Sequence, residues 1–92
     1  MKVMVFGTLR SVVGGSKEIE VQLDENSTIQ EVLAQVVADY PDLQKKVFSD
    51  REQLSAGVLV FVNGRSIRFL SGLDTRLHES DRLALFPPLA GG

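Results

Sequence analysis

This chain of 92 residues contains no cysteine and no tryptophan, and only one histidine. Without cysteine it can form neither a disulfide framework nor a thiolate metal site. His78 has no second histidine or cysteine to complete a metal site, so we interpret it as a solvated surface residue. The absence of disulfides is compatible with a reducing compartment, and we expect the protein to be cytoplasmic.

Long hydrophobic runs and a strong charge of either sign are also missing. The apolar stretches fall far short of the ~20 residues that a membrane-spanning helix needs. The apolar start at residues 1–6 is too short for a signal peptide. A formal net charge of −2 argues against a general nucleic-acid-binding protein. We therefore expect one small domain with no membrane partner and no nucleic-acid partner.

Motifs for autonomous catalysis are absent as well. No serine lies in a nucleophile-elbow context, and no Gly-x-x-x-x-Gly-Lys loop could hold a nucleotide. Turn chemistry explains the acidic residues near the end of the chain better than acid–base catalysis does; these are Asp74, Glu79 and Asp81. We therefore expect the chain itself to bind no cofactor and no metal.

The first part of the chain predicts a β-hairpin. The apolar run at residues 2–6 and the alternating segment 17–23 are typical of strands. Residues 11–16 lie between them and contain Gly14 and Gly15, which indicate a flexible turn. We expect the two strands to pair antiparallel.

The clearest helix pattern follows the hairpin. Thr28 and Glu31 have the spacing of a capping box, which predicts that the helix begins there. The apolar positions then form one stripe with helical spacing: Ile29, Val32, Leu33, Val36, Val37 and Tyr40. Pro41 ends the helix, because the residue before a proline disfavours helical backbone. Between residues 41 and 57, Leu43, Val47 and Leu54 could anchor a second short helix and a surface loop.

Three further segments predict the rest of a sheet. Residues 58–62 are continuously apolar, and the following Asn63-Gly64 is typical of a tight hairpin turn. Residues 65–70 would be a short returning strand, and residues 82–86 the last strand. The order of elements predicts an α+β fold, in which a mixed sheet of four to five strands packs on one main helix.

The strand alternation predicts which side chains face outward. The inward positions are aliphatic: Val58, Val60, Val62, Leu83 and Leu85. Leu59, Phe61 and Phe86 then share the opposite face, which should be polar in a sheet covered by one helix. We interpret these three residues as a partner-binding patch. The alternative is a second small core covered by the loop at residues 41–57.

The chain ends in Phe86-Pro87-Pro88-Leu89-Ala90-Gly91-Gly92. The prolines cannot donate to a sheet, so they end the strand and hold the backbone extended. Gly91 and Gly92 carry no side chain, so the terminal carboxylate lies at the tip of a thin arm that could enter a narrow active site. A frayed tail is the alternative. We expect a folded domain at residues 1–86 and an extended tail at residues 87–92.

Three arginines could lie at one edge of the sheet near the tail. There Arg65, Arg68 and Arg82 could steer an acidic partner. A solvated rim with no specific role is the alternative.

Together these features resemble the ubiquitin-like β-grasp fold, and more narrowly the MoaD/ThiS family of sulfur carriers. Val60-Phe61-Val62-Asn63-Gly64, the capped helix at residues 28–41 and the segment at residues 81–92 carry the resemblance. It covers essentially the whole chain. The segment with the double proline resembles the corresponding segment of the molybdopterin synthase small subunit. It favours that branch of the family over the thiamine branch.

The resemblance implies that the terminal glycine is the reactive residue. In this family a ubiquitin-activating-type enzyme uses ATP and Mg to adenylate the terminal carboxylate, and a sulfur donor then displaces AMP to leave a thiocarboxylate. Gly92 would react, and Gly91 would be its required neighbour. The remaining tail residues and the patch would bind partners: Phe86, Pro87, Pro88, Leu89, Ala90, Leu59 and Phe61.

Other functions stay open at this point. If the chain belongs to the molybdopterin branch, its second partner would be the large synthase subunit. The chain would then be a protein co-substrate rather than a free-standing enzyme. The same chemistry could instead serve tRNA thiolation, thiamine synthesis or attachment to protein lysines. A ubiquitin-like module that only binds partners is the remaining alternative.

Overall fold

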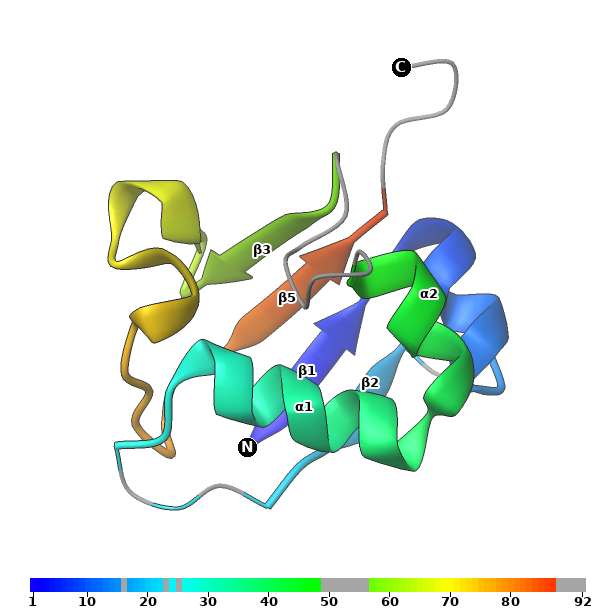
Figure 1. Ribbon diagram of the computed structural model, residues 1–92, viewed down its shortest axis with the longest axis horizontal. Coiled ribbons are helices and arrows are strands. Elements are labelled where there is room, and N and C mark those ends of the chain that lie inside the picture. Colours follow the sequence, from blue (N-terminus) through cyan, green and yellow to red (C-terminus); the bar gives the residue numbers. More distant parts are fainter. Residues whose placement is uncertain (16, 23, 25, 49–56, 88–92) are drawn as a thin grey trace.

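The computed structural model describes residues 1–15, 17–22, 24, 26–48 and 57–87. In this part of the chain a five-stranded sheet has the order β2-β1-β5-β3-β4. The strands are β1 (Lys2–Val5), β2 (Glu18–Glu20), β3 (Leu59–Val62), β4 (Arg65–Ser66) and β5 (Leu83–Phe86). Helices α1 (Ile29–Asp39) and α2 (Gln44–Val47) lie on one side of it (Figure 1). β1 and β5 run parallel at the centre and the other pairs are antiparallel, which confirms the predicted mixed sheet.

The hairpin of β1 and β2 is confirmed, but the connection between its strands is more regular than predicted. Val3 pairs with Ile19 in antiparallel register. A 3₁₀-helix, η1 (Gly7–Val13), occupies the connection and ends at Gly14, which has a positive φ of 70°. The predicted flexible turn is therefore wrong up to Val13. Leu9 and Val13 are buried in the core, and this pair four residues apart orders the segment.

The capping box at the start of α1 is confirmed. The Glu31 backbone N–H donates to Thr28 Oγ1 at 3.2 Å, and the Thr28 backbone N–H donates to Glu31 Oε1 at 3.2 Å. The buried stripe of α1 consists of Ile29, Val32, Leu33 and Val36. After Pro41, a 3₁₀ turn, η2 (Pro41–Leu43), leads into the predicted second helix, which buries Leu43 and Val47. The third predicted anchor, Leu54, lies outside the described residues.

The turn between β3 and β4 is also confirmed, whereas the length of β4 is not. Asn63 and Gly64 both have positive φ, 51° and 83°, as a tight hairpin turn requires. The predicted strand at residues 65–70 ends at Ser66, and a 3₁₀-helix, η3 (Ile67–Phe69), follows it. A second short 3₁₀-helix, η4 (Gly72–Asp74), precedes the return to β5.

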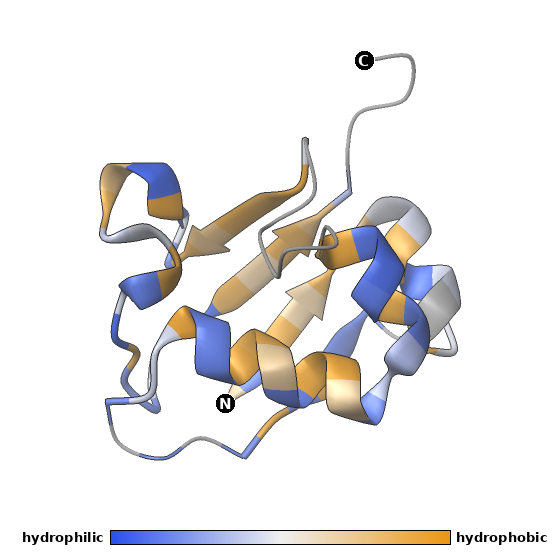
Figure 2. Ribbon diagram, in the orientation of Figure 1, coloured by the Kyte–Doolittle hydropathy of each residue, from blue (hydrophilic) through white to orange (hydrophobic). Residues whose placement is uncertain are grey.

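The core lies between the sheet and α1. Side chains from both layers are almost fully buried there, among them Val3, Val5, Leu33, Val60, Leu83 and Leu85. Figure 2 shows hydrophobic colour along the central strands and both hydrophobic and hydrophilic colour on α2. Of the helices in the described ranges, none combines the length and the apolar character needed to cross a bilayer.

Candidate functional site

The predicted patch residues lie together on the face of the sheet that α1 does not cover. Leu59 pairs with Phe86 across β3 and β5, and Phe61 lies two positions further along β3. The rings of Phe61 and Phe86 meet edge to face, with centroids 5.3 Å apart. All three side chains are half-buried, whereas Val60 and Leu85 beside them are buried on the helix side. The predicted strand alternation is therefore confirmed, and partner binding by this face stays a prediction.

Sequence analysis missed a third ring in this cluster. Phe6 stacks on Phe86 with centroids 4.3 Å apart and an interplanar angle of 7°. Its backbone N–H also donates to the Leu85 carbonyl at 3.1 Å. The guanidinium of Arg10 lies 5.5 Å from the Phe6 ring centroid, and Arg10 Nε donates to the Val5 carbonyl at 2.8 Å. The sequence predicts a strand at residues 2–6, whereas β1 ends at Val5, and only the parallel pairing of β1 with β5 brings Phe6 beside Phe86.

The first residue of the tail, Pro87, packs against Gly7, the first residue of η1. Gly7 has a φ of +59°, and a Cβ at this position would lie 2.8 Å from Cγ of Pro87. Such a contact is too short for any real Cβ, so a side chain here would displace Pro87. The stacked ring of Phe86 and the bare backbone of Gly7 together fix the direction in which the chain leaves β5.

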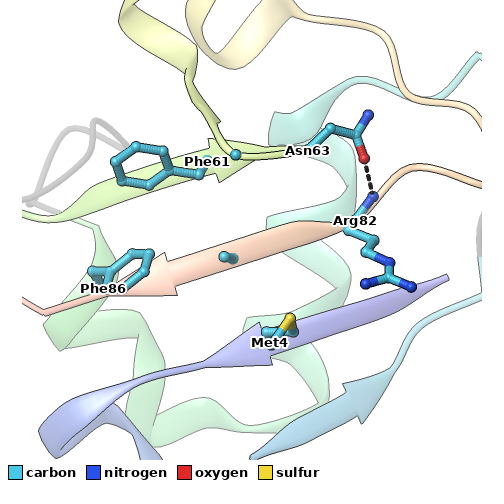
Figure 3. A pocket seen from close by; sticks show the side chains of 7 residues that line it. Met4, Phe61, Asn63, Arg82 and Phe86 are labelled. Atoms are coloured by element: carbon cyan, nitrogen blue, oxygen red, sulfur yellow. Dashed lines mark hydrogen bonds between the residues drawn. The ribbon is translucent and has the colours of Figure 1, made fainter.

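A groove of about 650 Å³ crosses this face (Figure 3). It is lined by Met4, Phe61, Asn63, Gly64, Arg82, Ala84 and Phe86. Its polar end is organised by Asn63, whose Oδ1 accepts from the Arg82 backbone N–H at 2.9 Å. The groove is thus apolar where the tail begins and polar at the opposite end.

The hydrogen bonds of Asp81 confirm the prediction that its carboxylate stabilises a turn. Its Oδ2 accepts from the His78 backbone N–H at 2.8 Å, and its Oδ1 accepts from Asn63 Nδ2 at 2.9 Å. The hydrogen bond from the His78 backbone lowers the pKa of Asp81, and the Asn63 hydrogen bond adds to this effect. His78 is exposed, as expected. The described part of the chain contains no group of three or more side chains that could hold a metal ion.

The arginines are not where the sequence placed them. All three are exposed, but Arg65 and Arg82 lie at the end of the sheet opposite the tail. The register shows this, because Val62 pairs with both Arg65 and Leu83, whereas Phe86 pairs with Leu59 at the other end of β3. Arg68 follows in η3. The prediction that Arg65 and Arg82 flank the tail is therefore wrong, because the hairpin turn carries them away from it.

The other predicted site residues lie beyond the described part of the chain: Pro88, Leu89, Ala90, Gly91 and Gly92. The boundary between the domain and its tail is consistent with the end of β5 at Phe86, but it stays a prediction.

The alternative that the loop at residues 41–57 covers the patch is tested only in part. Leu43 and Val47 join the core packed beneath the sheet and so do not cover the patch, and residues 49–56 are not described.

Comparisons with known proteins connect this geometry to a family. Residues 3–92 match the ThiS family. The chain is 36% identical to small archaeal modifier protein 3 from Haloferax volcanii, over 100% of this chain and 98% of that protein. The crystal structure of SAMP1 from the same organism superposes with a TM-score of 0.86 at 32% identity, covering 99% of this chain and 97% of that one. A chain of the Amycolatopsis orientalis BexX/CysO complex superposes with a TM-score of 0.84 at 27% identity, covering 99% and 98% of the two chains.

The match confirms the fold that the resemblance implied. The five strands and the helix packed on them are those of a ubiquitin-like β-grasp domain, and the solved relatives superpose on nearly the whole chain. The family match extends over the aromatic face and continues through the glycine end. This chain belongs to the ThiS family of ubiquitin-like sulfur carriers.

Proposed function

We propose that this protein carries sulfur as a thiocarboxylate on Gly92, loaded in the cytoplasm by a partner enzyme of the ubiquitin-activating type. The partner supplies ATP and Mg, and this chain supplies the carboxylate and a docking face. The observation that carries the proposal is the family match that runs through residue 92. The base of the tail supports it, because Phe86 lines the groove on the free face and Pro87 packs against Gly7.

The chemistry suits a terminal glycine. An α-carboxyl group has a reference pKa of about 3.3–3.7, so it is ionised at neutral pH and can attack the α-phosphorus of ATP. Pyrophosphate leaves, and a sulfur donor then displaces AMP from the acyl adenylate. The resulting thiocarboxylate is a nucleophile. The chain has no cysteine, so no internal thiol can intercept the activated carbonyl.

The free face is the docking surface that this scheme needs. Leu59, Phe61 and Phe86 are half-buried and lie next to the point where the tail leaves the sheet. Interface cores are enriched in aromatic residues, and Phe6 enlarges the aromatic cluster of this face. The solved relative in the BexX/CysO complex supports binding to another protein chain. An activating enzyme and an acceptor enzyme would use the face in turn.

For the acceptor, we propose the precursor of molybdopterin, with this chain as the small subunit of molybdopterin synthase. The large subunit would then be the second partner, and the chain a co-substrate with no catalytic machinery of its own. The support is the resemblance of residues 81–92 to that subunit, including the Pro87-Pro88 pair. Sulfur transfer to tRNA or to the thiamine precursor would use the same tail.

A second function is attachment to protein lysines. The observation that favours it is the 36% identity to a relative named small archaeal modifier protein 3. Attachment leaves a diagnostic mark, because Arg82 is the last basic residue of the chain. Trypsin would therefore leave residues 83–92 as a branch on the modified lysine. Detecting that branch in the cellular proteome would establish modification.

Deletion of Gly91 and Gly92 separates these functions from simple binding. In cells that lack the protein, the shortened chain should fail to restore molybdoenzyme activity, whereas the full chain should restore it. If the protein only binds partners, the shortened chain should still restore the activity. If the full chain restores no molybdoenzyme activity but restores tRNA thiolation or lysine branches, the carrier chemistry stands and the acceptor is corrected.

A further inference from the structure

The turn after β4 displays an exposed aromatic side chain. Phe69 is 82% exposed, and the neighbouring Leu70 is 37% exposed. The other described phenylalanines are buried or held in ring contacts: Phe6, Phe48, Phe61 and Phe86. A lone exposed apolar residue is ordinary in a soluble protein. Phe69 differs because it follows Arg68 in η3 and a groove borders this turn.

Local hydrogen bonds hold Phe69 in this position. Ile67 is 4% exposed and anchors η3 in the core. Ser66 Oγ accepts from the Arg68 backbone N–H at 3.3 Å, and the Leu70 backbone N–H donates to the Ile67 carbonyl at 3.0 Å. Because these hydrogen bonds close the turn and Ile67 is buried, η3 holds the backbone of Phe69 at the surface with its side chain exposed.

A groove of about 290 Å³ runs beside this turn. It is lined by Val58, Leu59, Val60, Ser66, Ile67, Arg68, Gly72 and Leu73. β4 pairs with β3 only through Phe61 and Val62, so the groove follows the part of β3 that β4 does not cover. In Figure 1 the yellow turns stand beside β3, at the edge of the sheet opposite β2. None of these lining residues lines the groove on the free face.

The segment at residues 65–76, part of which lines this groove, has a charge opposite to that of the whole chain. Residues 65–76 contain three arginines and one aspartate, a net charge of +2, whereas the chain carries −2. Arg65 and Arg68 are exposed, and within the described ranges neither forms an ion pair. Asp74 is the acidic residue of the neighbouring η4. Arginine and aromatic residues together are the composition of interface hot spots.

We propose that Phe69, Arg68 and this groove bind an extended acidic segment of a protein partner. An apolar side chain of the segment packs between Phe69 and the groove, and its carboxylates pair with the guanidinium groups of Arg65 and Arg68. A protein fits better than a nucleic acid, because two arginines offer few phosphate contacts and the rest of the chain is acidic. Leu59 lines this groove and also belongs to the free-face patch, so the two surfaces meet at this residue. The proposed binding does not involve the chemistry at Gly92.

The test is an NMR titration of the ¹⁵N-labelled full chain with the synthetic peptide Glu-Asp-Leu-Phe-Asp-Glu. Amide shifts should change at residues 65–73 and at Val58–Val60, and the changes should shrink as salt is added. Phe69→Ser should weaken binding several-fold at an unchanged melting temperature, because its side chain is mostly solvent-exposed. Arg68→Gln should weaken it as well. Lys17→Gln is the control, since it removes a positive charge at the opposite edge of the sheet.

Four outcomes would overturn the proposal. The first is the absence of shifts, or equal shifts with a peptide in which lysine replaces the acidic residues. The second is shifts confined to the face of Phe61 and Phe86, which would place the binding on the other groove. The third is stronger binding of a uridine hexanucleotide to the same residues, which would indicate a nucleic-acid partner. The fourth is a concentration-dependent shift of these residues without peptide, which would make a second copy of the chain the occupant.

Discussion

The two faces of the sheet differ in how deeply their side chains are buried. On β5, Leu83 and Leu85 are fully buried against the helix layer, while Ala84 and Phe86 are only half-buried on the other side. One residue of strand therefore separates a position that holds the fold together from a position available to a partner. The difference teaches that alternation in a strand can place a core position beside an accessible one, where the proposed partner binding would cost little stability.

The largest expected effect falls on the covered face. Leu85→Ala should destabilise the protein by about 2–5 kcal/mol, because Leu85 is fully buried and the truncation leaves a cavity. Urea denaturation followed by circular dichroism measures the change. A loss below about 1 kcal/mol would mean that the two faces do not differ in the way described.

The neighbouring position on the free face should respond in the opposite way. Phe86→Asp should reduce affinity for the activating enzyme by tenfold or more, because a charge in an interface core must be desolvated. The free energy of unfolding of this variant should fall by only about 1–2 kcal/mol, the order expected for two lost ring contacts. Calorimetric binding and urea denaturation of the same variant give both values. Global unfolding would instead identify Phe86 as a core residue and would break the comparison.

A smaller effect should come from the base of the tail. Gly7→Val should slow loading of the tail several-fold, because a Cβ at Gly7 would lie 2.8 Å from Cγ of Pro87. Gly14→Val is the matched control, since Gly14 also has a positive φ, +70°, and an added Cβ there would meet nothing within 4 Å. Both variants should lose similar stability from the left-handed backbone. Equal loading rates for the two would show that the direction of the tail does not matter.

The smallest effect concerns Asp81 at the polar end of the groove. Its lowered pKa means that the folded state binds its proton less tightly than the unfolded chain does. Its contribution to stability is therefore present above the usual pKa of about 3.8 and is lost as pH falls through the lower folded value. Solvent screening limits this contribution to a few tenths of a kcal/mol. Asp81→Asn should be slightly less stable than the wild type at pH 7, and the difference should shrink as the pH falls below 3.8.

Much of this architecture could be predicted from local sequence patterns. The capping box of Thr28 and Glu31, the turn at Asn63-Gly64 and the outward position of Phe61 all depend on neighbours a few residues away. The stacking of Phe6 on Phe86 could not be predicted in this way, because it requires β1 and β5 to be adjacent although 80 residues separate the two rings. The contact between Gly7 and Pro87 depends on the same long-range pairing.

Two errors have local causes. The segment before Gly14 was predicted as a turn because of its glycines, although the spacing of Leu9 and Val13 was a helical pattern that could have been found. Residues 65–70 were predicted as a strand, and the Ser66 hydroxyl instead caps a 3₁₀ turn. This turn exposes Phe69 and borders the groove along β3, so a strand prediction at residues 65–70 could not indicate that groove.

The two grooves suggest different tasks for the two regions. The groove on the free face adjoins the base of the tail, whereas the groove beside Phe69 lies along the outer edge of β3. A partner that contacts both would gain affinity through the higher effective concentration of the second contact. The tail end would then decide the chemistry, and the edge of the sheet would help to select the partner.

The most direct test of the account is the intact mass of the chain after incubation with a cognate activating enzyme, ATP, Mg and a sulfur donor. The wild-type chain should gain about 16 Da as one carboxylate oxygen is replaced by sulfur. Phe86→Asp, still folded, should gain this mass at least tenfold more slowly. No gain by the wild type with an enzyme that is active on another carrier would contradict the assignment of Gly92, and equal rates for the two chains would contradict the role of the free face.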